Sequence, residues 1–202
     1  TIEIIDGGMT YIRVTDDGNG MSREDARLAI LRHATSKIHT ADDLSAINTL
    51  GFRGEALPSI AAVSKFTLLT RTAEADLACC IRVTGGTVED VSDAGGAVGT
   101  TVQVADLFFN TPARRKFLKT SATESGYINH IVSKLALANP QISFKLTSNN
   151  RLVLATPGNG SLADTLASLY GKDIIGDLLP LEFSKDDFAV TGYIGKPTLL
   201  KS

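Results

Sequence analysis

This 202-residue sequence has little cysteine or histidine and no tryptophan: it contains two cysteines and three histidines. Cys79 and Cys80 are neighbours in sequence, and neighbouring residues of a strand point to opposite faces, so they are poorly placed to form a disulfide with each other. His33, His39 and His130 do not have the spacing of metal ligands. We therefore expect a reducing compartment, no disulfide framework and no metal centre built from these residues.

Long hydrophobic runs are also absent. No apolar stretch approaches the roughly 18 residues that a membrane span needs, and the N-terminus lacks the basic region and apolar core of a signal peptide. Apolar residues make up 43% and charged residues 21% of the chain, with a net charge of -2. This composition is ordinary for a globular protein. We expect a cytoplasmic protein that does not bind membranes and is no general nucleic-acid coat, although a local basic patch is compatible with this charge.

The sequence has no initiator methionine and begins within an expected strand. We therefore expect it to be a piece of a longer protein. The segment TPGNG at 156–160 is the strongest candidate boundary along the chain, because it is rich in proline and glycine. It predicts one domain over residues 1–157 and the start of a second, truncated domain over residues 158–202.

Hydrophobic periodicity predicts both helices and strands. The expected strands are 2–5, 11–14, 66–70, 78–83, 100–104, 142–146, 152–155 and 188–194. The expected helices begin at Ser22, at the capping box 40–43 and at Thr111-Pro112, and cover 55–63, 124–138 and 161–170. On the helix at 124–138, the spacing predicts a buried side made of Ile128, Ile131, Val132, Leu135 and Ala138.

The first candidate site has the form D-x-G-x-G and runs from Asp16 to Gly20, between an expected strand and an expected helix. The carboxylate of Asp16 can accept a hydrogen bond from an exocyclic amino group. Gly18 and Gly20 would let the backbone pass close to a flat ring or a phosphate. The pattern favours a nucleotide base, and the alternative is a polar turn or a loop similar to a calcium-binding loop.

Two further segments have features of a phosphate site. In RHATSK (32–37), two hydroxyls and one ammonium group follow a helix; the alternative is a basic helix end that complements the helix dipole. In GFRGEAL (51–57), two glycines precede a helix whose first backbone N–H groups would bind an anion. The alternative there is a glycine-capped loop, and the spacing of a P-loop is absent.

The fourth candidate combines Gly99-Thr100-Thr101 with the segment DLFFNTPARRKFL at 106–118. Thr100 is placed to reach a base or a bound water. A compact basic cluster follows, suited to phosphate contacts without base readout; it consists of Arg114, Arg115, Lys116 and Lys119. The alternative is a solvated helix face with Phe117 and Leu118 in the core.

These four motifs, in this order, resemble the N-terminal region of the MutL family of DNA mismatch repair ATPases. That family shares a superfamily with DNA gyrase, the Hsp90 chaperones and sensor histidine kinases. GFRGEAL is the most specific match, and RHATSK and DLFFNTPARRKFL match as well. The resemblance spans the chain and implies an α/β sandwich, with a mixed, mostly antiparallel sheet and helices on one face, followed by the start of a second α/β domain of a ribosomal-protein type.

The resemblance also implies a role for each matching residue. Asp16 would bind the adenine amino group, Gly18 and Gly20 would line the base pocket, and Thr100 would support the adenine through Asp16 and water. The lid over the phosphates would consist of Thr35, Ser36 and Lys37 together with the backbone of Gly51, Phe52, Arg53, Gly54, Glu55, Ala56 and Leu57. ATP and Mg²⁺ are the implied cofactors of the intact protein.

Parts of the family pattern are missing from this sequence. In the family, a helix before the first strand carries a Glu-x-x-x-Asn pair, in which Glu is the general base and Asn holds Mg²⁺. Thr1 lies after that helix. We therefore expect no catalytic residue and no metal ligand in this chain, weak nucleotide binding and no hydrolysis. A phosphate-contacting lysine and a C-terminal dimerisation region would lie beyond Ser202.

Three functions are compatible with these motifs. The resemblance favours a piece of a MutL ATPase, in which ATP orders the lid and joins two N-terminal regions into a homodimer that relays mismatch recognition by MutS to repair enzymes. The second is a nucleic-acid-binding module that binds DNA largely independently of sequence through residues 114–119. The third is another member of the superfamily, such as a histidine kinase, and GFRGEAL argues against it.

Overall fold

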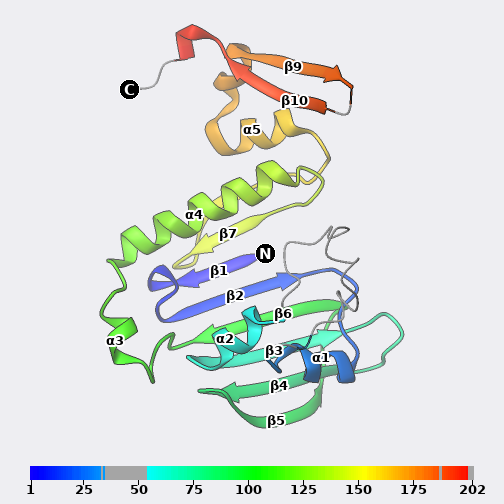
Figure 1. The fold of residues 1–202 in the computed structure, drawn as a ribbon, viewed down its shortest axis with the longest axis vertical. Helices are drawn as coiled ribbons and strands as arrows, with labels where there is room; N and C mark the ends of the chain where they lie inside the picture. The colour runs from blue at the N-terminus through cyan, green and yellow to red at the C-terminus, as the bar shows by residue number, and fades with distance from the viewer. Residues whose placement is uncertain (33, 35–53, 187, 200–202) are drawn as a thin grey trace. The chain divides into compact units, whose positions relative to one another are not determined.

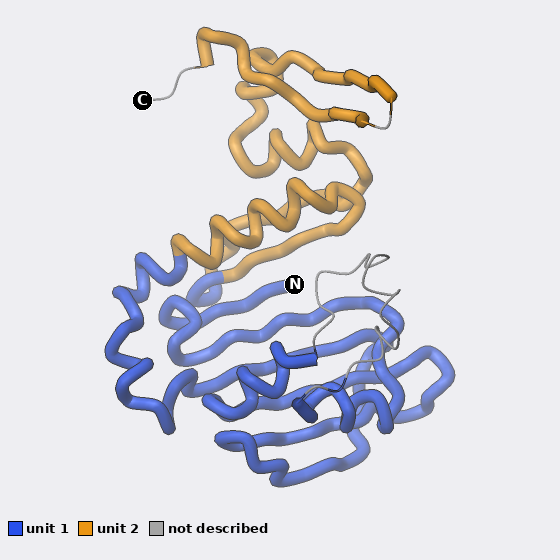
Figure 2. The backbone as a smooth tube through the Cα atoms, in the orientation of Figure 1, with its two compact units in different colours: residues 1–125, 148–150 blue, residues 126–147, 151–202 orange. Residues whose placement is uncertain are grey.

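A computed structural model (Figure 1) describes residues 1–32, 34, 54–186 and 188–199. The chain divides into two compact units, residues 1–125 with 148–150, and residues 126–147 with 151–202 (Figure 2). The predicted domain boundary at residue 157 stays a prediction, because compactness alone does not define a domain. The predicted capping box at 40–43 and the helix after it lie outside the described residues.

The first unit is built on six strands in the order β5-β4-β3-β6-β2-β1. Each neighbouring pair is antiparallel. The strands are β1 Ile2–Ile5, β2 Tyr11–Asp16, β3 Lys65–Arg71, β4 Ala78–Thr84, β5 Thr87–Ala94 and β6 Gly99–Ala105. The expected strands at 2–5, 11–14, 66–70, 78–83 and 100–104 are thereby confirmed. Cys79 and Cys80 are both buried and both free.

β5 is a strand that the sequence pattern did not indicate. Its sequence, TVEDVSDA, is polar, and its residues are exposed or half-buried throughout. Among the described strands it lies at the edge of the sheet and pairs with β4 alone. Two ion pairs connect β5 to other segments: Arg82 on β4 contacts Asp90 at 3.0 Å, and Arg23 on α1 (Arg23–Ala29) contacts Asp93. An edge strand with charged side chains also resists pairing with another chain.

Short helices cover one face of this sheet. They are α1 Arg23–Ala29 and α2 Ala56–Ala61, while a 3-10 helix, η1 Asp6–Gly8, joins β1 to β2 and α3 Pro112–Arg115 follows β6. Ser22 caps α1, as predicted, because its hydroxyl oxygen accepts the backbone N–H of Asp25 at 3.1 Å. Pro112 occupies the first turn of α3, where its missing N–H costs no helical hydrogen bond.

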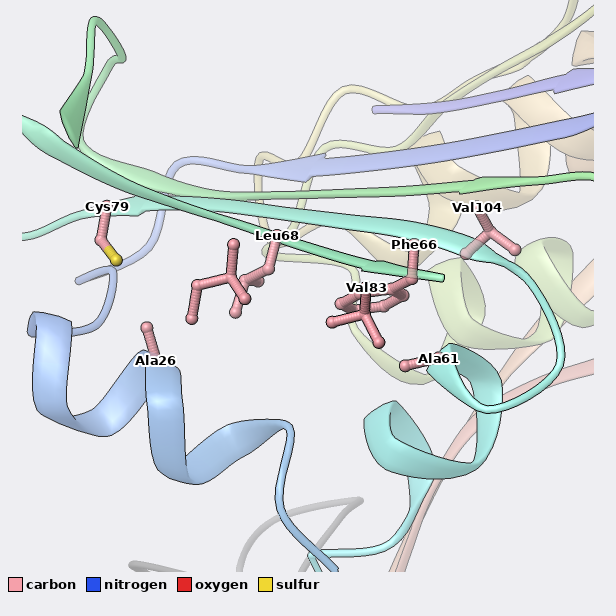
Figure 3. Packing of buried hydrophobic residues seen from close by; sticks show 8 residues of the cluster. Ala26, Ala61, Phe66, Leu68, Cys79, Val83 and Val104 are labelled. Carbon is pink, nitrogen blue, oxygen red and sulfur yellow. The ribbon is translucent and has the colours of Figure 1, made fainter. Parts of the chain in front are cut away.

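The core of the unit lies between the sheet and these helices (Figure 3). On β3, buried Phe66, Leu68 and Thr70 alternate with less buried residues, as expected for a strand with one covered face. Phe66 and Leu68 pack with Ala26 of α1 and Ala61 of α2. The expected arrangement, an α/β sandwich with helices on one face of a mostly antiparallel sheet, is confirmed.

The longest of the described helices, α4 Ser121–Ala138, matches the predicted buried side only in part: Val132 is buried as predicted, and Ile128 and Leu135 are half-buried. Val132 and Ala136 are buried, whereas Ile131 is 59% exposed and Ala138 is exposed. The prediction was therefore wrong for Ile131 and Ala138. Val132 and Ala136 are four residues apart and share one stripe of the helix. Ile131 lies about 100° away from that stripe, since one residue advances a helix by that angle.

The rest of the chain forms the expected hairpin, whose first strand begins at Lys145 rather than at the expected Ile142, and a second, smaller sheet. Its further elements are β7 Lys145–Ser148, β8 Arg151–Ala155, α5 Leu162–Tyr170, η3 Lys172–Asp177, β9 Leu178–Lys185, β10 Phe188–Gly195 and η4 Pro197–Leu199. Asn149 and Asn150 join β7 to β8 with φ values of 48° and 62°, the conformation of a type I′ turn. Ser161 caps α5 by accepting the N–H of Asp164 at 3.1 Å. None of the helices among the described residues is long and apolar enough to span a membrane.

Removing core volume from the first unit should destabilise the chain strongly. Leu68 is 0% exposed, so Leu68→Ala leaves a cavity and should lower the free energy of unfolding by about 2–5 kcal/mol. Leu77 is 57% exposed in the same unit, and Leu77→Ala should change it by less than about 0.5 kcal/mol. Urea unfolding followed by circular dichroism measures both. Equal losses for the two variants would contradict the packing described here.

Candidate functional site

Asp16, Thr100 and Thr70 lie side by side on three adjacent strands. Asp16 pairs with Thr100 between β2 and β6, and Thr70 pairs with Thr100 between β3 and β6. Directly paired residues of antiparallel strands point to the same face. Because Thr70 lies on the same face of β3 as buried Phe66 and Leu68, this is the face that α1 and α2 cover.

The carboxylate of Asp16 is held through one oxygen. Oδ1 accepts the backbone N–H of Gly18 at 3.0 Å and that of Thr100 at 3.3 Å. Among the described residues, none donates a hydrogen bond to Oδ2, and the side chain is exposed. The carboxylate is thus fixed in orientation while its second oxygen remains able to accept a hydrogen bond from a ligand.

The glycines of this region are required by close backbone packing. Gly20 has φ +69°, and a Cβ there would overlap the carbonyl oxygen of Arg71 at the end of β3. Gly99 has φ +115°, and a Cβ there would overlap the carbonyl oxygen of Asp16. Glycine is therefore required at positions 20 and 99 even without a ligand, because it lets the loop after β2 lie against β3 and β6. The predicted contact of Gly18 and Gly20 with a base stays a prediction.

Thr70 connects these segments and is the site residue that sequence reasoning missed. Its Oγ1 accepts the backbone N–H of Met21 at 2.9 Å, donates to the carbonyl oxygen of Gly99 at 3.1 Å, and lies 3.0 Å from Oγ1 of Thr100. A buried threonine in a strand is common and carries no motif. Only the register of β3 against β6 reveals that it lies beside Thr100.

The predicted lid is only partly within the described residues. Thr35, Ser36, Lys37, Gly51, Phe52 and Arg53 lie outside them. Gly54 has φ +64°, and a Cβ on it would overlap the carbonyl oxygen of Ala34. The residues that flank the segment 35–53 are thus in contact. Glu55 is the residue before α2, Ala56 is its first residue, and Leu57 packs against the core; their predicted contact with phosphates is untested.

The basic segment, defined here as residues 114–119, is open to solvent. Its cations are all exposed, and none forms an ion pair with a described residue; they are Arg114, Arg115, Lys116 and Lys119. Phe117 is 81% exposed, so the alternative that places it in the core is wrong, whereas Leu118 is half-buried. α3 ends at Arg115, and the chain therefore leaves the helix before Phe117 can turn toward the sheet.

The turn that precedes α3 is anchored to the sheet. Phe108 donates its backbone N–H to the carbonyl oxygen of Val63 at 2.7 Å, and the Asn110 side chain donates to that of Ala62 at 2.9 Å. Nζ of Lys65 on β3 donates to the Asp106 carboxylate at 2.8 Å. This hydrogen bond and then the charge of Lys65 hold the pKa of Asp106 below its ordinary value, and Arg115 adds a smaller lowering.

The acidic and imidazole side chains do not gather into a metal centre. Within residues 1–32, 34, 54–186 and 188–199, no group of three His, Cys, Asp or Glu side chains is arranged to hold a metal ion.

Comparison with solved structures defines the class of the fold. An Aquifex aeolicus MutL ATPase domain complexed with ADP matches with a TM-score of 0.68 at 30% sequence identity, over 90% of this chain and 63% of that chain. The N-terminal domain of a DNA repair protein matches with a TM-score of 0.77 at 27% identity, over 98% of this chain and 63% of that chain. The fold is that of the MutL-type ATPase domains, in the class shared with gyrase, Hsp90 and histidine kinases.

Curated relatives agree with this class. The DNA mismatch repair protein MutL of Symbiobacterium thermophilum is 51% identical over 201 residues, which are 100% of this chain and 32% of the relative. MutL of Desulforudis audaxviator is 49% identical, over 100% of this chain and 36% of the relative. No protein-family model matches. The chain belongs over its whole length to the MutL family of DNA mismatch repair proteins, and it spans about a third of the length of these relatives.

Removal of Lys65 should raise the pKa of Asp106 toward its ordinary value. Lys65→Gln removes the charged donor, and Arg115→Gln should cause a smaller rise because Arg115 acts only through its charge. NMR titration of the Asp106 carboxyl carbon measures both. Since the folded-state pKa is depressed, the Asp106 carboxylate stabilises the fold above its unfolded pKa, and this contribution is lost as the pH falls through the folded value. A larger rise in Arg115→Gln would contradict the assignment.

Proposed function

We propose that this chain is the adenine-nucleotide-binding part of a MutL protein, with Asp16 as the residue that recognises the base. The observation that supports this most directly is the carboxylate of Asp16. One of its oxygens is held by Gly18 and Thr100, and no described residue bonds to the other. An exocyclic amino group is the complementary donor on adenine.

The surroundings of Asp16 also fit a purine base. Thr100 is paired with Asp16, and its hydroxyl oxygen lies on the same face of the sheet as the Asp16 carboxylate. The glycines at 18 and 20 carry no side chain that would cover the carboxylate. One structural neighbour is a MutL ATPase domain complexed with ADP. That likeness supports nucleotide binding by this chain as part of the proposal.

In the proposed cycle, ATP supplies the phosphoanhydride bond whose cleavage separates two conformational states. Within this chain, Asp16 and Thr100 orient the base, and a lid made of Thr35, Ser36 and Lys37 with the backbone of residues 51–57 covers the phosphates. Support for this lid is the close packing of Gly54 against Ala34, the residue before Thr35.

The wider role follows from the family. We propose that nucleotide binding joins two N-terminal regions of the intact protein into a homodimer, and that this dimer couples mismatch recognition by MutS to later repair enzymes in the cytoplasm. A nucleotide shifts such an equilibrium only through different affinities for the two states. The supporting observation is the name of the relatives, DNA mismatch repair protein MutL.

Replacement of the Asp16 carboxylate should weaken adenine nucleotide binding selectively. Asp16→Asn removes a charged acceptor, so the affinity for ADP should fall about 10- to 100-fold. NMR titration with ADP up to millimolar concentration measures even weak binding. Asp17→Asn is a matched control, because it makes the same charge change on the next, exposed residue of the same loop. It should bind ADP within about twofold of the wild type.

The outcomes of this titration separate the possible explanations. Equal losses in both variants would show a charge effect rather than base recognition. Unchanged binding in Asp16→Asn would place the base elsewhere. If the wild type does not bind ADP, the base pocket of this chain alone is not functional, although the family assignment still stands on sequence identity.

The exposed basic segment supports a second function, the binding of DNA through its phosphates. Four cations within six residues have no acidic partner among the described residues. Such contacts would be independent of sequence. Nucleotide binding and DNA binding are compatible in one protein, and they use different residues of this chain.

DNA binding through the basic segment should be steeply dependent on salt. Fluorescence anisotropy with a duplex of about 30 base pairs should show log K falling with log salt, by about 0.9 for each phosphate contact. The triple variant Arg114→Ala, Arg115→Ala, Lys116→Ala should weaken binding and reduce that slope. A control variant removes three exposed cations from the other unit, Lys145, Arg151 and Lys172. If both variants reduce the slope equally, the basic segment is not the DNA site.

A further inference from the structure

We propose that Thr70 is a positioning residue of the base pocket, which makes the hydroxyl of Thr100 a hydrogen-bond acceptor and so favours a base with an amino group at position 6. The inference rests on the proposed function, because it assigns a specificity role within the same site. It concerns a residue on β3 that belongs to none of the four sequence motifs.

Because Thr70 is buried, loss of its hydrogen bonds would leave its partners without a replacement donor or acceptor. Its side chain is 1% exposed, so water does not replace a lost partner there. Its Oγ1 meets the backbone N–H of Met21, the carbonyl oxygen of Gly99 and the hydroxyl of Thr100. These three partners come from the loop after β2 and from the start of β6. One hydroxyl therefore ties together the two segments that carry Asp16 and Thr100.

Counting protons and lone pairs gives one arrangement in which all three contacts of Thr70 are hydrogen bonds. A threonine hydroxyl has one proton to donate and two lone pairs to accept with. The carbonyl oxygen of Gly99 only accepts, so it takes the Thr70 proton; the N–H of Met21 only donates, so it takes one lone pair. When all three contacts are hydrogen bonds at once, Thr100, whose Oγ1 is 3.0 Å away, donates its proton to the remaining lone pair of Thr70.

The consequence lies at Thr100. With its proton donated to Thr70 in this arrangement, the hydroxyl of Thr100 has only lone pairs left for other partners. The free oxygen of Asp16 and the hydroxyl of Thr100 together form a pair of acceptors. The 6-amino group of adenine has two N–H donors, which this pair accepts directly or through a water. Without Thr70, the Thr100 hydroxyl rotates and can donate or accept, so the preference for an amino group weakens.

The test compares two nucleotides on the 202-residue chain. ADP carries the 6-amino group, and the diphosphate of purine riboside lacks it. Thr70→Val keeps the shape of the side chain and removes the hydroxyl. It should weaken ADP binding about tenfold and should reduce the preference for ADP over the purine diphosphate. Thr70→Ser restores the hydroxyl and should return both the affinity and the preference to within about threefold of the wild type.

The chain offers a matched control on the opposite face of the same sheet. Thr15 and Thr101 form a second hydroxyl pair, 3.1 Å apart, on β2 and β6. Thr101→Val breaks this pair and should leave both affinities unchanged. If Thr70→Val does not fold, as judged by circular dichroism, Thr70→Cys replaces it. Its thiol is a weak hydrogen-bonding group, and it should give losses between those of the serine variant and those expected for valine.

Each outcome has a defined meaning. Loss of both affinity and amino-group preference in Thr70→Val, with rescue by serine, supports the inference. A lower thermal stability of Thr70→Val with unchanged preference shows a merely structural role and overturns it, while the proposed function stands if Asp16→Asn still abolishes binding. If the wild type does not bind ADP, the proposed function fails for this chain and the inference fails with it.

Discussion

The antiparallel register of β6 between β2 and β3 is the constraint on which the proposed site depends. It places Asp16, Thr100 and Thr70 in one row across three strands. A shift of one residue in either pairing would turn one member of the row to the opposite face of the sheet. The buried core of Phe66, Leu68 and their partners holds this register, since the same shift would expose those side chains.

The row combines rigidity with an open acceptor. Its buried end, Thr70, is fully hydrogen-bonded, and its exposed end, Asp16, keeps one carboxylate oxygen for a ligand. The glycines at 20 and 99 allow the loop after β2 to lie against the neighbouring strands. A base-recognition residue benefits from such support, because an acceptor that is already oriented loses little entropy on binding.

Most of the fold was predictable from local pattern, and the exceptions have physical causes. Alternation predicted β3, β4 and β6, and capping residues predicted the start of α1 at Ser22. β5 was missed because an edge strand needs no apolar face, and the buried side of α4 was misplaced at Ile131. Asp16 and Thr100 were indicated by local motifs and then given roles by the resemblance to MutL, whereas Thr70 has no sequence signal. Its role depends on strand pairing between residues far apart in the chain.

Backbone amide NMR of the ¹⁵N-labelled chain with ADP is the sharpest test of whether Asp16 and Thr100 recognise the base. We predict that the largest shift changes among the described residues occur at Gly18, Gly20, Met21 and Thr100. Changes confined to the basic segment at 114–119 would contradict it, because they would show that the nucleotide is bound through its phosphates at the cationic surface and that the row on the sheet does not read the base.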